Sequence, residues 1–251
     1  METQSCCQSH GGAALLERPR FFPRQLVTPD DLMLAQDYLR NKLRRMTRYL
    51  HGWGVVCGAR VVFPDVPPEK LPDWKVVVKP GYILGPRGDE IVIDREICFD
   101  LRNRCFQAIS GDPCAESVTE AGCGGSARPP ASGDRYIAVR YLEFPSRPVR
   151  VQPAACGCDD TRCEYSRWRD GYEICVLDRC PPSHARPEPT DPQTLPDCPP
   201  CPDDPWVVLA MVNVDAQGKV TRIENCSCRI LIAPPARAVC FEAPTPRPAS
   251  S

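Results

Sequence analysis

The chain has 251 residues, which is enough to bury one hydrophobic core or two small ones. Its formal net charge of −1 excludes the strongly basic character of a dedicated nucleic-acid-binding protein, so no nucleic-acid partner is expected. The sequence contains no apolar run long enough to span a membrane.

The N-terminal end, residues 1–17, has neither the positively charged start nor the apolar stretch of a secretion signal. We therefore expect the chain to be synthesised in the cytoplasm. Residues 1–17 and the tail at residues 234–251 are made largely of small, polar or proline residues. We expect both ends of the chain to be flexible.

A single long helix is predicted from Thr28 to Leu50. Thr28 suits the N-cap, because its hydroxyl can accept a hydrogen bond from the first turn, and Pro29 suits the first helical position. Gly52 and Gly54 follow the last turn and favour its termination. The apolar residues recur at three- and four-residue steps and form one stripe: Leu32, Ala35, Leu39, Leu43, Met46 and Leu50.

The helix also carries a basic face, made of Arg40, Lys42, Arg44, Arg45 and Arg48. Such a run of charge is typical of a solvated face, or of a face that meets acidic groups on a neighbouring subunit. We prefer both interpretations to a nucleic-acid contact, because the chain as a whole has no basic excess.

Beyond the helix the pattern predicts antiparallel β structure. Apolar or alternating segments predict strands at residues 55–63, 74–79, 98–101, 135–144, 171–178 and 206–214. Glycine-containing turns within residues 80–94 and at residues 216–218 predict hairpins. Residues 102–133 are rich in glycine and other small residues, which is typical of a loop.

The sequence therefore predicts an α+β, mostly β protein, in which one long N-terminal helix precedes antiparallel strands, hairpins and long loops. The 30 prolines and 17 cysteines concentrate in those loops, where proline's fixed φ and missing amide hydrogen are tolerated. The expected regions are a helical adaptor with the first strand (18–62), a β-hairpin region (63–110), a loop (111–133) and a β region (134–233) with a Cys/Pro-rich insertion (180–204).

Three segments resemble a known family in the same order along the chain. The first is RPRFFPRQL, a charged helix and LHGWGVVCG within residues 18–60. The others are VVVKPGYILGPRGDEIVID (76–94) and VLAMVNVDAQGKVTRIEN (208–225). Together they resemble the N-terminal module and hairpins of bacteriophage tail, baseplate and tail-fibre-like proteins, including those of phage-like contractile injection systems.

The resemblance implies a structural, non-enzymatic component of a tail-like particle that acts by assembling with other subunits, and self-association of copies is compatible with it. The N-terminal block would dock onto the particle, with Arg18, Phe21, Phe22 and Trp53 as interface residues. Particles of this kind leave the cell by lysis, so the resemblance implies that the assembled particle is released to the outside.

A second hypothesis is a carbohydrate- or cell-surface-binding module. The segment CEYSRWRDGYEICVLD contains Tyr165, Trp168 and Tyr172, and aromatic side chains with polar tips are enriched at interfaces. The same residues are also consistent with rings that cover the core. An enzyme is the least favoured class, because the sequence has only three histidines, with His184 in a predicted loop, and no nucleophile elbow, phosphate-binding loop or HExxH motif.

The cysteines are the chemically most informative set. CGCDDTRC and CPPC place thiols at spacings that can surround a tetrahedral Zn²⁺. The favoured ligands are Cys158, Cys163, Cys198 and Cys201, with Cys156 or Cys180 as a replacement for one of them. Four thiolates leave no open coordination position, so the expected role is structural.

Disulfides are the alternative to zinc. The pairs considered are Cys226 with Cys228, Cys175 with Cys240, and pairs among Cys105, Cys114 and Cys123. Cys57 and Cys98 lie in apolar predicted strands, where a buried free thiol is the expected state.

Overall fold

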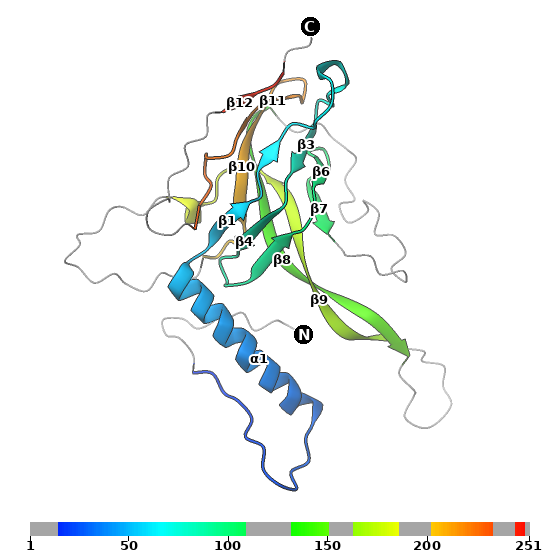
Figure 1. The fold of residues 1–251 in the computed structure, drawn as a ribbon, viewed down its shortest axis with the longest axis vertical. Coiled ribbons are helices and arrows are strands. Elements are labelled where there is room, and N and C mark those ends of the chain that lie inside the picture. Colours follow the sequence, from blue (N-terminus) through cyan, green and yellow to red (C-terminus); the bar gives the residue numbers. More distant parts are fainter. Residues whose placement is uncertain (1–14, 109–131, 151–162, 186–201, 233–243, 249–251) are drawn as a thin grey trace, which may run out of the picture.

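The computed structural model describes residues 15–108, 132–150, 163–185, 202–232 and 244–248. A single long helix, α1 (Pro29–Met46), projects from a body made of β-sheets (Figure 1). The α+β, mostly β prediction is confirmed, and α1 is the longest helix in the described part of the chain. No described helix is long and apolar enough to cross a membrane.

The β body is formed by twelve described strands and two short 3-10 turns. The strands are β1 (Gly54–Gly58), β2 (Val61–Val62), β3 (Lys75–Val78), β4 (Gly81–Leu84), β5 (Glu90–Ile93), β6 (Ile97–Asp100), β7 (Cys105–Ala108), β8 (Gly133–Arg150), β9 (Cys163–Leu177), β10 (Val207–Val214), β11 (Val220–Glu224) and β12 (Thr245–Pro246). The 3-10 turns are η2 (Pro68–Lys70) and η3 (Pro182–His184).

The ends of α1 follow the local sequence signals. Thr28 Oγ1 accepts a hydrogen bond from the Asp31 amide at 3.2 Å, and the Asp31 carboxylate accepts one from the Thr28 amide at 2.9 Å, which makes a capping box. At the other end α1 passes into one π-turn, η1 (Thr47–His51). Gly52, with φ 75°, then ends the helical segment in a conformation that glycine adopts without strain.

The strand predicted over residues 55–63 is two strands in the structure. It breaks after β1, because Gly58 (φ 62°) and Ala59 (φ 50°) both have positive φ angles. A side chain at Gly58 would place its Cβ only 2.2 Å from the carbonyl oxygen of Pro80, so the close approach of two chain segments requires glycine. The break lets β1 join the sheet β1-β4-β5, while β2 joins the sheet β2-β3-β6.

The third sheet has six strands in the order β12-β11-β10-β8-β9-β7. It contains the long β8–β9 hairpin, which runs much further than the strands predicted at residues 135–144 and 171–178. β7 also falls within the segment that was predicted as a loop, and it pairs with β9. β7 gains its strand conformation from β9, which lies far along the chain, and the extended parts of β8 and β9 gain theirs from pairing with each other.

One hydrophobic core lies among the three sheets. Its large, fully buried side chains include Ile83, Phe99, Ile137, Ile174 and Leu209. A polar clasp also joins two sheets within this core. The Asn225 side chain accepts a hydrogen bond from the Val61 amide (2.8 Å) and donates one to the Val61 carbonyl (3.0 Å). The backbone amide and carbonyl of Val61 are therefore both hydrogen-bonded, so burying Val61 leaves neither group without a partner.

Candidate assembly interface

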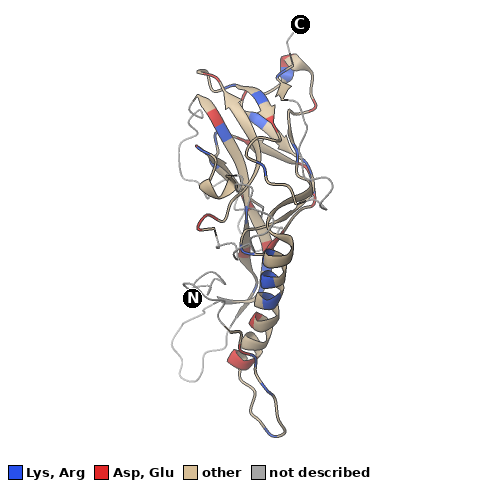
Figure 2. Cartoon of the chain, turned by 90° about the vertical axis from the view of Figure 1, so that its left-hand side faces the viewer, with Lys and Arg blue, Asp and Glu red and all other residues tan. Residues whose placement is uncertain are grey.

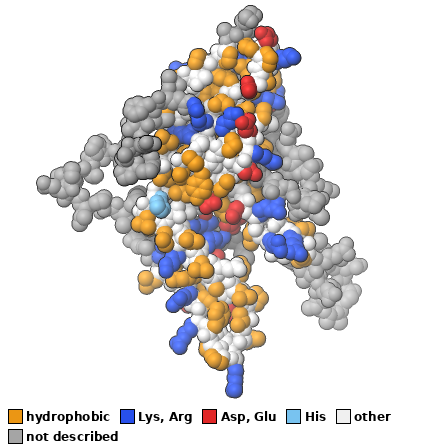
Figure 3. Space-filling model, viewed as in Figure 1, with side chains coloured by type: hydrophobic (Ala, Val, Ile, Leu, Met, Phe, Trp, Pro, Cys, Tyr) orange, Lys and Arg blue, Asp and Glu red, His pale blue; other side chains and the backbone are white. Residues whose placement is uncertain are grey.

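The helix α1 is attached to the body by its charged side and leaves its apolar side open. No residue of α1 is buried. The predicted stripe includes Leu39 and Leu43, which are 61% and 63% exposed. Hydrophobic side chains therefore gather along the projecting helix (Figure 3). An exposed apolar face of this kind marks an interaction surface in soluble proteins.

The segment that leads into the helix is exposed as well. Phe21 and Phe22 are 52% and 61% exposed. They lie next to a tight turn in which Arg24 has a φ of 69°, and the Phe22 amide donates to the Gln25 side chain at 3.1 Å. Arg18 places its guanidinium 5.9 Å from the centre of the Tyr38 ring of α1. Arg18, Phe21 and Phe22 are thus exposed in the segment before α1, and Arg18 reaches the middle of the helix.

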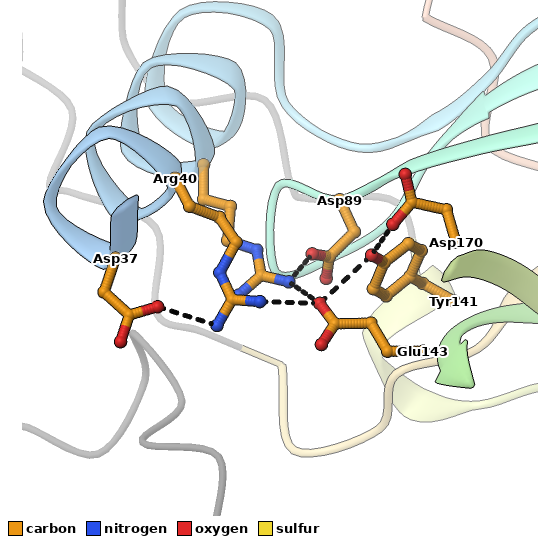
Figure 4. Close-up of polar contacts among 7 residues, drawn as sticks. Asp37, Arg40, Asp89, Tyr141, Glu143 and Asp170 are labelled. Carbon is orange, nitrogen blue, oxygen red and sulfur yellow. Dashed lines mark hydrogen bonds and ion pairs between the residues drawn. The ribbon is translucent and has the colours of Figure 1, made fainter. Parts of the chain in front are cut away.

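An ionic cluster, which we call the joint, fixes α1 to the body (Figure 4). Arg44 contacts Asp89 at 2.5 Å and Glu143 at 3.4 Å, and Arg40 contacts Glu143 at 2.8 Å. Arg40 also pairs with Asp37 one turn back along α1 at 3.3 Å. Two residues of the basic face, Arg40 and Arg44, therefore meet acidic groups of their own chain. The sequence had instead predicted that this face is solvated or meets a neighbouring subunit.

The joint brings together three elements that are distant in the sequence. Asp89 comes from the turn between β4 and β5, and Glu143 comes from β8. The adjacent Gly88 (φ 86°) touches the helix backbone, since a Cβ there would lie 2.2 Å from the Arg44 carbonyl oxygen. The turn GPRGDE thus has a definite role, because its glycine permits close packing and its aspartate supplies the counter-charge.

Tyr141 extends the joint into the β8–β9 hairpin. Its hydroxyl lies 2.5 Å from Asp170 and 3.1 Å from Glu143, and the Arg44 guanidinium lies 5.8 Å from the centre of its ring. Burial, together with hydrogen bonds to these carboxylates, raises the pKa of Tyr141, so the phenol stays protonated and can donate. Burial raises the pKa of Asp89, and Arg44 opposes that effect.

Beyond the body the β8–β9 hairpin continues as a two-stranded ribbon (Figure 1). β10 pairs with β8 only as far as Val139, and β7 pairs with β9 only from Tyr172 onward. Residues 140–150 and 163–171 therefore pair with each other and with no further described strand. Such a ribbon presents two faces and two edges to a partner.

The predicted aromatic residues of this ribbon do not form one surface. Tyr165 and Trp168 are 55% and 66% exposed, but they are three residues apart on a strand and point to opposite faces. Trp168 shares its face with Tyr172, which is buried against the core. Trp53, also predicted at an interface, packs partly buried against the core, with its ring edge-on to His184 at 4.8 Å.

The predicted zinc ligands fall largely outside the described residues. Cys156, Cys158, Cys198 and Cys201 lie outside them, and Cys163 is described only by its backbone, at the start of β9. One cluster with metal-ligating atoms close together occurs in the described residues: Cys105, Glu173 and Cys175. Its two cysteines form a disulfide with each other, so the cluster offers no pair of thiolates to a metal.

The disulfides differ from the pairs considered from sequence. Cys105 pairs with Cys175 directly across β7 and β9, and Cys180 pairs with Cys228. Cys226 is disulfide-bonded too, so the suggested Cys226–Cys228 pair is wrong. The Cys175–Cys240 pair is wrong for the same reason, because Cys175 is already bonded.

The two free cysteines of the described residues also differ from expectation. Cys57 and Cys98 are exposed, although both lie in strands. Cys98 alternates with the buried Ile97 and Phe99, so the period of two places its side chain on the outer face of the sheet. Cys57 follows an irregularity in the β1–β4 register and lies between two exposed residues, Val56 and Gly58. A buried thiol at either position is therefore wrong.

Comparisons with known proteins give little beyond this geometry. No protein-family model matches the chain, and no curated protein matches it. Among solved structures, it is similar to a chain in the type VI secretion system TssK-TssF-TssG baseplate subcomplex, determined by cryo-electron microscopy. The identity is 13% and the TM-score 0.36, over 82% of this chain and 59% of that one. A similarity at this level assigns the chain neither an activity nor a partner.

Proposed function

We propose that the chain is a structural subunit of a phage tail-like or contractile injection particle, acting as a baseplate, fibre or adaptor component by subunit assembly. The observation that carries the proposal is the apolar face of α1, which is attached to the body through the joint and left exposed by the described residues. The resemblance of residues 18–60, 76–94 and 208–225 to tail and baseplate proteins supplies the setting.

The physical argument is that an uncovered apolar helix is stabilised by a partner. In proteins most helical stability comes from burial of an apolar face, and each large aliphatic side chain removed from water contributes roughly 1.5–3 kcal/mol. α1 buries none of its residues within the chain. Its attachment instead uses Arg40 and Arg44, so the helix is positioned while its apolar side chains remain available for other subunits.

The proposal predicts that particle incorporation depends on the aromatic segment before α1. Replacing Phe21 and Phe22 with serine should abolish recovery of the tagged chain in purified particles, because both rings are exposed and would lose their apolar contact. The measurement is the amount of tagged chain per particle, with electron microscopy of the same preparation.

A matched control is Val66→Ser, which removes another exposed apolar side chain from a loop of the body, away from the helix. This variant should be incorporated like the unaltered chain. If the phenylalanine variant and the Val66 variant were recovered equally, the N-terminal segment would not be the docking surface.

The second candidate function is binding of a carbohydrate or another cell-surface ligand. The exposure of Tyr165 and Trp168 favours it, since exposed aromatic rings can stack on sugars or insert into a partner. Because the two rings face opposite sides of the ribbon, each could engage only its own ligand. Glycan binding by the purified, monomeric chain would favour this candidate over assembly.

We also propose that one structural Zn²⁺ is held by Cys158, Cys163, Cys198 and Cys201 when the chain is made in a reducing cytoplasm. Disulfides do not persist under those conditions, so metal coordination is the cross-link that can order a proline-rich region with many thiols. Elemental analysis of freshly purified, reduced protein should give about one zinc per chain. Replacing Cys198 and Cys201 with serine should remove it.

The control for the zinc measurement removes two other thiols. Replacing the exposed, free Cys57 and Cys98 with serine should leave the zinc content unchanged. A zinc content near zero in the unaltered, reduced protein would show that these thiols are bridged or free.

A further inference from the structure

The exposed stripe of α1 has the spacing of a coiled-coil seam. Leu32, Gln36, Leu39, Leu43 and Met46 follow one another at alternating steps of four and three residues, and all five are exposed. With Leu32, Leu39 and Met46 at d positions, Gln36 and Leu43 occupy the a positions of the heptad repeat. We call these five residues the seam. This spacing fits another helix packed alongside, with knobs inserted into holes.

Within the described residues, the body of the same chain does not cover the seam. At 3.6 residues per turn, the joint residues Asp37, Arg40 and Arg44 lie roughly 110° around the helix from the centre of the seam. The seam therefore faces sideways, past the body, along a helix that projects away from it (Figure 1). A helix from outside the chain can approach without displacing the joint.

We propose that the seam pairs with the same seam of a second copy of this chain, in parallel, and the inference rests on the proposed assembly function. In a parallel pair each layer joins identical residues, so leucine meets leucine and Met46 meets Met46 of the second copy. Gln36 meets Gln36 of the second copy, and the two amides can each donate to and accept from the other. A polar a position of this kind specifies register and parallel alignment.

The charges beside the seam select the parallel over the antiparallel arrangement. In a parallel pair, Lys42 at a g position lies opposite Thr47 of the second copy, and Ala35 lies opposite Arg40. Neither contact places like charges together. In an antiparallel pair, Lys42 would face Lys42 of the second copy and Arg40 would face Arg40.

The remaining charges of the helix do not oppose this arrangement. The other basic residues, Arg44, Arg45 and Arg48, occupy b, c and f positions, which point away from the partner helix. Figure 2 shows the acidic groups at the start of α1 and the basic groups further along it.

Sedimentation of the full-length chain tests the pairing. The unaltered protein should self-associate as its concentration rises, and the Leu39→Glu, Leu43→Glu double variant should remain monomeric. Leu34→Glu is the matched control, because Leu34 is also exposed but lies on the opposite side of α1, so it should leave self-association unchanged. Circular dichroism of each variant checks that the helix persists.

The orientation is tested at Thr47. Thr47→Glu places a carboxylate opposite Lys42 of the second copy only in the parallel pair, and should tighten association about two- to five-fold at low salt. Thr47→Lys should weaken it by a similar factor. In an antiparallel pair Thr47 faces Met33, so equal association of the two variants would overturn the parallel arrangement.

Two outcomes separate this inference from the proposed function. A chain that is monomeric at every concentration but is still recovered in particles overturns self-pairing, and its helix partner is then another subunit. A chain that self-associates through the seam but is absent from particles leaves the pairing standing and removes the particle role. A Leu34 variant that dissociates as fully as the seam variant would also overturn the inference.

Discussion

Replacing Arg44 with methionine is expected to lower the free energy of unfolding by about 3–5 kcal/mol, because it leaves a buried carboxylate without its partner. Arg44 contacts Asp89 at 2.5 Å, and the two side chains are only 16% and 8% exposed. Methionine preserves most of the side-chain length, so the change removes the charge with little loss of packing. Urea unfolding at pH 7 measures the loss.

The loss should shrink as the pH falls. Burial raises the pKa of Asp89 above 3.8, and Arg44 partly opposes that shift. Without Arg44 the pKa rises further. A carboxyl whose folded-state pKa is raised holds its proton more tightly in the folded protein, so stability falls as the pH rises through the window that starts near 3.8. The Arg44 variant should therefore approach the unaltered protein in stability at acidic pH, where Asp89 is protonated.

Two further variants isolate the buried charge as the cause. Adding Asp89→Asn to Arg44→Met should recover most of the stability, because an amide does not have to be neutralised. Arg40→Met should have a much smaller effect, since Arg40 is 40% exposed and its partner Glu143 keeps Arg44 and Tyr141. A loss that is the same at every pH, or that persists in the Asn variant, would mean that Asp89 is not its source.

The helix was predictable from sequence because its signals are local. Thr28, Pro29 and Gly52 act within one turn of the residues they cap or stop, and the structure places the helix at these limits, apart from the change to a π-turn after Met46. The stripe was predicted for the same reason. Its exposure was not predictable, since an apolar stripe looks alike whether it faces the chain's own core or a partner.

The joint could not be predicted, because its partners meet only through the tertiary fold. Arg44 is separated from Glu143 by 99 residues, and Asp89 lies in a hairpin turn whose charged sequence carries no signal of its own. The disulfides show the same limit. Cys105 and Cys175 become partners because β7 and β9 pair in a register that places them directly opposite one another.

The extent of the β8–β9 hairpin was missed for a related reason. The predicted strands at residues 135–144 and 171–178 correspond to the part of the hairpin that contributes buried side chains to the body. Beyond it, Pro145 and Pro148 argue against a central strand, and they occur here because the ribbon has no third strand that would need their amide hydrogens.

Acidification is expected to destabilise the fold through His184. This residue lies in a segment that the sequence predicted as a loop, with no indication that its side chain is buried. The side chain is buried, and its Nε2 accepts a hydrogen bond from the Val208 amide at 3.1 Å. Burial lowers the pKa of His184 to about 4 from its usual 6.5. The unfolded chain therefore takes up a proton below pH 6.5 that the folded chain resists, and stability falls as the pH drops from about 6.5 to about 4.

The loss of unfolding free energy that His184 causes over this pH range amounts to about 3 kcal/mol, since each unit of difference between its folded and unfolded pKa corresponds to about 1.4 kcal/mol. It is measured as the difference in urea unfolding between the unaltered protein and His184→Gln over this pH range. The glutamine carbonyl can still accept from Val208 but does not titrate, and both proteins keep Asp89, whose raised pKa acts in the opposite direction. The variant should therefore lose less stability than the unaltered protein on acidification. Parallel pH profiles would show that His184 becomes protonated without cost, and that its burial does not restrict its charge.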